Sequence, residues 1–371
     1  NLHFVQLLES NKIMDIKKKV TMHDVAKKAG VSYQTVSRVL NNSCNVSNST
    51  KEKIEQAIAE LKYVPNLLAQ QLAKKEVNTI GLINAAVLSL STVEVTLSVR
   101  KYAEQNNYNL ESKLVSDFTS QGIQESIDEL RSLLINKIIV NAPVNSQDAI
   151  FLTEQNKDIK ILFVDVDPYC PVLNVTFNPA DGTLFSVSHL KQLGHKKIAL
   201  LAGPEGVSSA DSRLKCWREG IAINNMEEVC LCRGDWTAES GYFSTLKMLR
   251  DHKGFTAILV ANDQMALGAM SALKQADLSI PDDVSVVGYD DFSDSSYYQP
   301  ALTSVHLDRE LQCKLAVEKL ISDEQNISSV LPTSLVIRKS TGFVGAKDAN
   351  LKHIIEDLKK ATLLLESTID N

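Results

Sequence analysis

Hydrophobic positions follow three different spacings along this chain of 371 residues. Between residues 20 and 62 they recur every three or four residues, which is typical of short amphipathic helices. From residue 78 to about residue 340, short apolar runs alternate with helix-like stretches, as in proteins with parallel sheets. After residue 350 the spacing becomes 4-3-4-3-4, which indicates a coiled-coil seam. The pattern therefore predicts a helical head, an α/β body and a helical tail.

The first helix of the head is defined by its ends as well as by its apolar face. The positions i, i+3, i+4 and i+7 of that face are occupied by Met22, Val25, Ala26 and Ala29. Thr21 and Asp24 are spaced as in a capping box, with Asp in place of the usual Glu or Gln. Gly30 is suited to end this helix and Ser32 to begin another. Two short helices joined by a turn that contains glycine form a helix-turn-helix.

The second predicted helix, at about residues 33–41, has two dissimilar faces. The apolar face consists of Val36, Val39 and Leu40, and the opposite face of Gln34, Ser37 and Arg38, flanked by Tyr33 and Thr35. Gln can pair with adenine and Arg with guanine in the major groove of DNA. These side chains lie near the helix N-terminus, which is the end that enters the groove. A polar face that contacts only water is the alternative interpretation.

A third helix is needed to close a core in so small a head. It is expected to begin near residues 48–50 and to bury Ile54, Ala57, Ile58 and Leu61. Pro65 then interrupts the chain, and residues 66–75 form a stretch that permits a helix but is too short to be stable alone. A plain linker is the alternative for this stretch.

The body alternates short apolar strands with helices, and this alternation implies doubly wound parallel sheets. Strands are predicted at residues 79–85, 109–115, 137–141, 160–165, 172–177, 197–202, 229–233, 257–261, 284–288, 304–307 and 334–338. Helices are predicted at residues 93–106, 120–134, 181–193, 209–224, 238–250, 265–276 and 311–322. The repetition predicts two lobes, one near 78–176 and one near 178–304, with the chain crossing back at the end.

Polar residues follow several of these strands, at the edge where open α/β sheets bind ligands. Asp165, Asn262-Asp263 and Asp290-Asp291 each follow an apolar run, and Arg213 lies in the helix after residues 202–204. Carboxylates, amides and a guanidinium can bind the hydroxyls of a polyol, while Trp236 and Phe177 can cover its apolar faces. For any single residue, a helix N-cap is the alternative role.

The tail carries a heptad seam after a spacer at residues 342–349. Its apolar positions are Leu351, Ile355, Leu358, Thr362, Leu365 and Ile369, with charged residues on either side. Because a spacer separates this helix from the body, association between chains is favoured. A helix docked on its own body is the alternative.

Charge separates the head from the rest of the molecule. The net charge is −6, yet residues 1–75 carry 12 Lys and Arg against 6 Asp and Glu. The remainder therefore carries a net charge of −12. A basic head on an acidic body indicates that only the head meets a polyanion.

Composition and motifs exclude several classes of protein. The chain is 44% hydrophobic and 23% charged, and no apolar run is long enough to span a membrane. The six cysteines form no CxxC pair and are expected to be free thiols in a reducing compartment. The seven histidines show no metal-ligand spacing, so neither a metal nor a cofactor is expected.

An enzyme is not expected, because no GxSxG, P-loop or GxGxxG follows a strand. Asp290 and Asp291 are adjacent and do not obviously form two carboxylates across a glycosidic bond. A transport-binding protein would share the body but would need export and would have no use for the head.

Residues 1–19 are expected to form a disordered extension. Residues 1–13 are interpreted as translated upstream sequence. Their apolar cluster precedes the lysines, whereas a secretory signal has the reverse order. We expect a cytoplasmic protein on nucleoid DNA.

The head resembles the LacI/GalR family of transcriptional regulators over the whole run from Val20 to Asn41. The resemblance implies that Tyr33, Gln34 and Arg38 read the major groove, and that phosphates are held by Thr21, Ser32, Thr35 and Asn41. It also implies that residues 66–76, which include the run Ala69-Gln70-Gln71-Leu72-Ala73, form a hinge helix. Leu72 would then enter the minor groove near Asn66 and Gln70, and such an apolar wedge can kink a duplex.

The body resembles the same family in its runs 198–204, 234–236, 259–270 and 286–291. The resemblance implies an effector site of Asp165, Phe177, Ser209, Arg213, Trp236, Asn262 and Asp290. The sequence departs from the galactoside-responsive members at Ser89, Ser91 and Thr92, where those members are more apolar. It departs again at Leu307 and Arg309, where they have Gln and Phe. The effector is therefore expected to be a sugar or galactoside, with altered walls around it.

The resemblance also suggests how the chain is organised. The expected parts are an extension (1–19), a helix-turn-helix head (20–65), a hinge helix (66–76), an effector-binding core (77–341), a spacer (342–349) and a tetramerisation helix (350–371). The function implied is a repressor of a sugar-utilisation operon, released from a palindromic operator by its inducer. Tetramers would form through Leu351, Ile355, Leu358 and Leu365. A regulator for a different sugar, or one that needs a corepressor, remains the alternative within the family.

Overall fold

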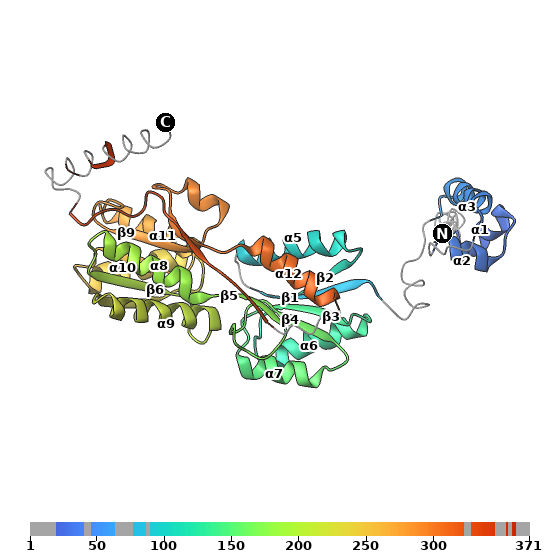
Figure 1. Ribbon diagram of the computed structural model, residues 1–371, viewed down its shortest axis with the longest axis horizontal. Coiled ribbons are helices and arrows are strands. Elements are labelled where there is room, and N and C mark those ends of the chain that lie inside the picture. Colours follow the sequence, from blue (N-terminus) through green and yellow to red (C-terminus); the bar gives the residue numbers. More distant parts are fainter. Residues whose placement is uncertain are drawn as a thin grey trace, which may run out of the picture. The chain divides into compact units, whose positions relative to one another are not determined.

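The computed structural model describes residues 20–40, 46–63, 77–86, 90–322, 328–345, 354 and 358–360. The chain divides into two units, the head (Asn1–Val77) and the core (Asn78–Asn371). Figure 1 shows both, with the head drawn in blue.

The head contains three helices, α1 (Met22–Ala29), α2 (Tyr33–Leu40) and α3 (Asn48–Leu61). The capping box of α1 is confirmed, because the Thr21 side chain accepts from the Asp24 amide and Asp24 accepts from the Thr21 backbone. Gly30 ends α1 with φ 68°, a left-handed conformation that favours glycine. The third helix begins at Asn48, within the expected range of 48–50, and Ser47 is its N-cap.

A small apolar core joins the three head helices. It is formed by Val25, Ala26, Val36, Val39, Ile54, Ala57 and Tyr63. A salt bridge of 2.9 Å between Lys28 and Glu60 links α1 to α3 at the surface. The predicted apolar faces are therefore the ones that the structure buries.

The core contains two six-stranded sheets, and helices cover both faces of each (Figure 1). The sheet of the first lobe has the order β11-β5-β4-β3-β1-β2, formed by Ser328–Leu331, Asn174–Phe177, Lys160–Phe163, Lys137–Asn141, Thr79–Ala85 and Asn109–Val115. The sheet of the second lobe has the order β12-β10-β9-β8-β6-β7, formed by Ser334–Val336, Thr303–His306, Ser285–Asp290, Ala257–Val260, Lys197–Ala202 and Glu227–Arg233. Only the pairing of β12 with β10 is antiparallel among the described pairs.

The helices of the core divide between the lobes. The first lobe has α5 (Leu90–Gln105), α6 (Ser120–Ser132), α7 (Ser146–Gln155) and α12 (Arg309–Ile321). The second lobe has α8 (Pro179–Gln192), α9 (Ser208–Ile223), α10 (Ala238–Asp251), α11 (Asp263–Gln275) and the short 3-10 helix η1 (Ser293–Tyr297).

The chain passes between the lobes three times. It leaves the first lobe after β5, returns to it between β10 and α12, and leaves again between β11 and β12. The predicted late crossover therefore consists of α12 and β11. Cys313, Ala316, Val317 and Leu320 of α12 are buried in the first lobe, where this helix packs on β3, β4 and β5.

The predicted elements differ from the observed ones mainly at their ends. The strand predicted at 160–165 ends at Phe163, and that predicted at 172–177 begins at Asn174. The strand predicted at 304–307 is Thr303–His306, and the one at 334–338 is Ser334–Val336. Helix α7 and strand β11 were not predicted, because their sequences are short and carry weak apolar periodicity.

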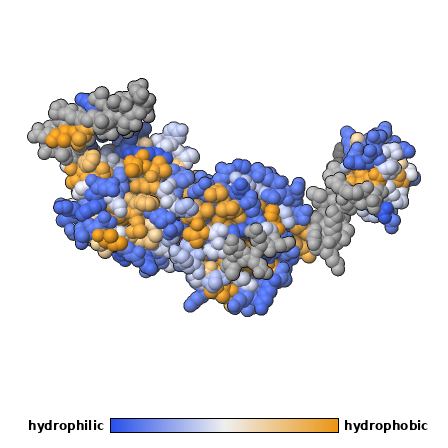
Figure 2. All heavy atoms as spheres, in the orientation of Figure 1, coloured by the Kyte–Doolittle hydropathy of each residue, from blue (hydrophilic) through white to orange (hydrophobic). Residues whose placement is uncertain are grey.

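The core surface is mainly hydrophilic with separate apolar patches (Figure 2). On α5, Val93 is 54% and Leu97 62% exposed, and Leu267 of α11 is 44% exposed. Val93 and Leu97 are four residues apart and share one face of α5, and large apolar groups exposed together on a folded core are typical of protein contact surfaces.

His195 is a buried histidine held in its neutral form. Its Nδ1 lies 2.8 Å from the Thr256 hydroxyl, and its Nε2 lies 3.1 Å from the Gly342 carbonyl and 3.0 Å from the Ser285 hydroxyl. Since a carbonyl can only accept, Nε2 carries the proton and Nδ1 accepts from Thr256. Burial lowers the pKa of His195 to about 4.

This burial makes the stability of the second lobe depend on pH. The folded pKa lies below the ordinary value of 6.5, so the unfolded chain takes up a proton first as the pH falls from 6.5 towards 4. We expect the free energy of unfolding to fall by up to about 1 kcal/mol per pH unit in this window from His195 alone. Urea unfolding at pH 7 and pH 5 measures this, and His195→Gln should show a shallower slope. An unchanged slope would refute the assignment.

Candidate effector pocket and DNA-reading helix

A cavity of about 320 Å³ lies between the two lobes, at the carboxyl ends of their parallel strands. In each sheet the strand order reverses beside the first strand, at β1 and at β6. Ligands of open α/β sheets bind at such switch points. Residues at or just beyond strand ends line the cavity, including Ala85 of β1 and Asn141 of β3 in the first lobe, and Pro204 after β6 and Asn262 after β8 in the second.

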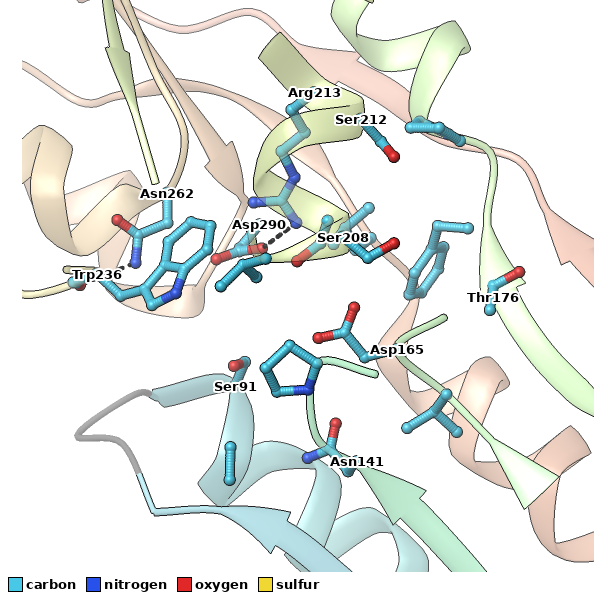
Figure 3. Close-up of a pocket in the computed structure, with 18 of the residues that line it drawn as sticks. Ser91, Asn141, Asp165, Thr176, Ser208, Ser212, Arg213, Trp236, Asn262 and Asp290 are labelled. Atoms are coloured by element: carbon cyan, nitrogen blue, oxygen red, sulfur yellow. Dashed lines mark hydrogen bonds and ion pairs between the residues drawn. The ribbon is translucent and has the colours of Figure 1, made fainter. Parts of the chain in front are cut away.

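The structure brings together the residues that the sequence singled out for an effector. The cavity is lined by Asp165, Phe177, Ser209, Arg213, Trp236, Asn262 and Asp290, and also by Ser91, Thr92, Leu307 and Arg309. Figure 3 labels six of them: Ser91, Asp165, Arg213, Trp236, Asn262 and Asp290. These residues come from elements as far apart as α5 and α12. Ser89 lies outside the described residues.

Trp236 forms one apolar wall of the cavity. Its indole packs so closely on Gly203 that a Cβ at that glycine would lie 2.3 Å from the ring. Trp236 adopts φ 77°, which is unfavourable for a bulky residue. The Asn262 amide holds it by donating to the Trp236 carbonyl at 3.0 Å. Strain of this kind persists where the surroundings hold it in place, and such places cluster at ligand sites.

Charged groups of both signs meet in the cavity. The Asp290 carboxylate lies 3.0 Å from Nη2 of Arg309 and 3.8 Å from Nη2 of Arg213. The Arg213 guanidinium also lies 3.8 Å from the centre of the Tyr289 ring. Burial raises the pKa of Asp165, and the positive charges of Arg213 and Arg309 oppose that rise. The set offers both hydrogen-bond donors and acceptors to a polar ligand.

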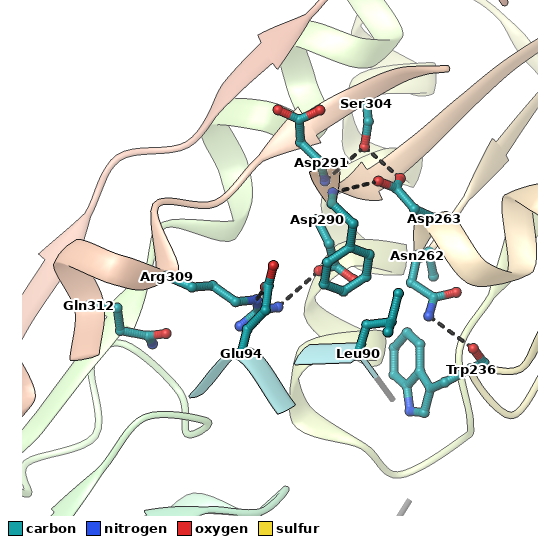
Figure 4. Close-up of polar contacts among 12 residues, drawn as sticks. Leu90, Glu94, Trp236, Asn262, Asp263, Asp290, Asp291, Ser304, Arg309 and Gln312 are labelled. Carbon is teal, nitrogen blue, oxygen red and sulfur yellow. Dashed lines mark hydrogen bonds and ion pairs between the residues drawn. The ribbon is translucent and has the colours of Figure 1, made fainter. Parts of the chain in front are cut away.

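The alternative role of an N-cap applies to some of the polar residues at strand ends. Asn262 caps α11 by accepting from the Met265 amide at 2.9 Å and also lines the cavity. Asp263 is fully buried and accepts from Ser304, Ser295 and the Phe292 amide, so it braces the second lobe (Figure 4). Burial raises the pKa of Asp263 to about 7. Asp291 pairs with Arg338 at 2.7 Å; neither Asp263 nor Asp291 is among the residues lining the described cavity.

Sequence reasoning missed several polar residues of the cavity wall. Asn141 ends β3, and its amide donates to the buried Asn84 at 2.8 Å, which in turn donates to Thr96. The buried Thr176 hydroxyl, on β5, has no hydrogen-bond partner. Asn141 follows the same strand-end rule that found Asp165, whereas Thr176 lies within a strand and gives no such signal. Ser208, Ser212 and Asp235 complete the wall.

The predicted DNA-reading face of α2 is exposed. Tyr33, Gln34 and Arg38 all face solvent, and Tyr33 stacks on His23 with ring centres 4.7 Å apart. Ser32 and Thr35 lie with their hydroxyls 2.8 Å apart, and Ser32 accepts from the Thr35 amide as an N-cap. Val36 and Val39 point into the core instead. Helix α2 therefore packs in the head through its apolar face and leaves its polar face exposed to solvent.

Several predicted residues lie outside the described part of the chain. They are Asn41, Asn66, Gln70 and Leu72 of the DNA-binding region, and Leu351, Ile355 and Leu365 of the tail. Leu358 is described and is 61% exposed. Among the described residues, no helix is long and apolar enough to cross a membrane, and no three metal-ligating side chains are grouped.

A helix-turn-helix head and a two-lobed core with a polar interlobe cavity define a DNA-binding regulator that responds to a small ligand. Residues 21–66 match the family described as bacterial regulatory proteins, lacI family, and residues 187–341 match a periplasmic binding protein-like domain. The chain is 39% identical to the lactose operon repressor of Escherichia coli (strain K12), covering 92% of this chain and 96% of that one. The chain belongs to the lacI family, and it is a sugar-responsive transcriptional repressor, not an enzyme.

Solved structures agree with this assignment. The lac repressor dimer bound to operator and the anti-inducer ONPF matches with a TM-score of 0.84 and 40% identity, covering 88% of this chain and all of that one. The lac repressor bound to ONPG in the repressed state matches equally well, covering 87% of this chain.

The position of Trp236 leads to an optical test of the cavity. The chain has two tryptophans, and Trp217 is buried in the second lobe with 1% exposure. In a Trp217→Phe variant, a bound sugar should shift the emission of Trp236 because it displaces water from the indole face. Trp236→Ala should weaken binding by about tenfold or more through lost apolar contact. If a Trp236→Phe variant that retains Trp217 showed the same fluorescence change, the ligand would bind elsewhere.

Proposed function

We propose that this repressor binds a palindromic operator as a homodimer and is released from it by a galactoside-like inducer. The observation that carries the proposal is the cavity between the lobes. It combines a tryptophan wall with three aspartates, two asparagines and two arginines. Polyols are bound by such sets, because hydroxyls need both donors and acceptors while the sugar face needs an aromatic surface.

The residues assigned to the effector are Asp165, Phe177, Ser209, Arg213, Trp236, Asn262 and Asp290. The lac repressor structure with ONPG supports a ligand of this size and class for a relative with the same fold. The polar lip at Ser91 and the wall at Leu307 and Arg309 tune the choice of sugar. A corepressor-dependent regulator is the alternative within the family, and relatives named PurR are 29–30% identical.

On the DNA side, Tyr33, Gln34 and Arg38 would read base edges in the major groove. Thr21, Ser32, Thr35 and Asn41 would contact phosphates, and the hinge with Asn66, Gln70 and Leu72 would enter the minor groove. The exposure of the α2 face supports base reading, because an exposed amide and guanidinium near a helix N-terminus suit the groove. The protein would act in the cytoplasm on nucleoid DNA.

The lobes would transmit the signal. Without inducer they would hold the paired hinge segments so that these can order on the operator, and inducer would favour another lobe arrangement. The shift is limited by the difference in the inducer's affinity for the two states. Exposed Val93 and Leu97 on α5 are suited to pairing two cores, and the tail from residue 350 would join dimers into tetramers.

The first experiment is a fluorescence-anisotropy titration of a palindromic lac-type operator at fixed salt. We expect tight binding that methyl β-galactoside releases and methyl β-glucoside does not. Binding that tightens with the ligand would identify a corepressor. Binding that ignores galactosides would leave the repressor intact and reject a galactoside as its effector.

Arg38→Ala tests base reading separately from effector binding. Loss of a guanidinium that contacts a guanine should weaken operator binding by about 1–3 kcal/mol and relax the preference at one base pair. Competition with random DNA at the same salt measures this. An equal loss on operator and random DNA would assign Arg38 to the phosphates instead.

A further inference from the structure

Arg309 is the one described cation that reaches across the cavity from the first lobe to the second. It is the first residue of α12, whose apolar face is buried in the first lobe. Its Nη2 donates to Asp290 at 3.0 Å, and Asp290 is the last residue of β9 in the second lobe (Figure 4). The pair is well shielded from water, since the two side chains are 17% and 6% exposed.

The rest of the Arg309 guanidinium is poorly satisfied. Its buried Nε has no hydrogen-bond partner, and Glu94 of α5 lies 3.9 Å from it, beyond hydrogen-bond distance. Asp290 lies closer to the guanidinium than Glu94 does and is far less exposed, so Asp290 is the main counter-charge of Arg309. Separating a buried cation from its one close carboxylate costs free energy, because it leaves the charge without compensation.

Asp290 is also the carboxylate that a sugar in this cavity would use. It lines the cavity and has φ 110°, a strained conformation for a residue that is not glycine. One other contact also joins the lobes at this end, from the Leu90 amide to the Gln264 side chain at 3.2 Å. Arg309 and Arg213 both approach Oδ1 of Asp290, so a sugar hydroxyl that donates to this oxygen must share it with Arg309 or displace it.

We propose that Arg309 is a specificity-determining residue that clasps the two lobes through Asp290 and competes with the sugar for that carboxylate. The inference rests on the proposed function for the identity of the sugar. It makes the lobe arrangement depend on an ion pair inside the effector site itself. A sugar is selected when one of its hydroxyls donates to Asp290 in place of the Arg309 guanidinium. A ligand that lacks a hydroxyl facing Asp290 binds while the ion pair between Arg309 and Asp290 stays intact.

Arg309→Met tests the competition, because Met keeps the length of the side chain and removes the charge. Asp290 keeps Arg213 as a counter-charge at 3.8 Å. We expect methyl β-galactoside to bind about tenfold more tightly to the full-length variant, measured by isothermal titration. Arg309→Lys, which keeps the charge, should return the affinity towards that of the parent protein.

The choice of ligand supplies a readout that a merely structural role would not move. Among monodeoxy derivatives of methyl β-galactoside, the one that lacks the hydroxyl facing Asp290 should bind the parent protein and Arg309→Met with affinities equal within about twofold, whereas the others should keep the gain. An equal gain for every derivative would overturn the competition. The matched control is Arg338→Met, which removes one of the two side-chain partners of the neighbouring Asp291, the other being His306. Arg338 and Asp291 are not among the residues that line the described cavity, so the affinity should stay unchanged within about twofold.

The clasp can also be tested without ligand. In the free protein, Arg309→Met and Asp290→Asn should be coupled by at least about fivefold in the unfolding equilibrium. Additive effects would overturn the clasp. Weaker galactoside binding by Arg309→Met would overturn the competition and make Arg309 a direct sugar contact. If no variant binds galactoside, the proposed inducer is wrong, and the coupling in the free protein decides the clasp alone.

Discussion

The direction of parallel strand pairing is the constraint on which the core depends. Strands that run parallel must all end at the same edge of their sheet, and the strand order leaves a crevice there. Both lobes use the same order around β1 and β6, so each presents its crevice through residues such as Asn141 and Asn262. Side chains that are distant in sequence meet at this place because their strands end there.

The cavity concentrates unfavourable local features that the surrounding fold stabilises. Trp236 and Asp290 have positive φ angles, and Gly203 leaves room that no other residue could leave. Asp263 is buried beside them, with hydrogen bonds from Ser295 and Ser304 that brace the end of β9. Because these supporting residues hold the site rigid, residues of the cavity wall can be substituted without loss of the site's geometry.

Much of this arrangement could be predicted from the sequence, and the limits have physical causes. The capping box of α1 and the strand-end position of Asp165 depend on local rules, so the sequence predicts them directly. The strand end does not distinguish Asn262, which faces the cavity, from Asp263, which braces the second lobe. Thr176 and the pairing of Arg309 with Asp290 depend on contacts between distant elements, which no local pattern records. The short β11 escaped prediction because its pairing with β5 is fixed only by the tertiary fold.

The three passages of the chain between the lobes bear on how the protein folds during its synthesis. The first lobe needs α12 to cover β3 and β4, and it needs β11 to complete its sheet. Both elements follow the whole run of residues from β6 to β10. A ribosome must therefore release nearly all of the second lobe before the first one can close. Until then the exposed face of β3 and β4 and the free edge of β5 make the nascent core a candidate for chaperone binding.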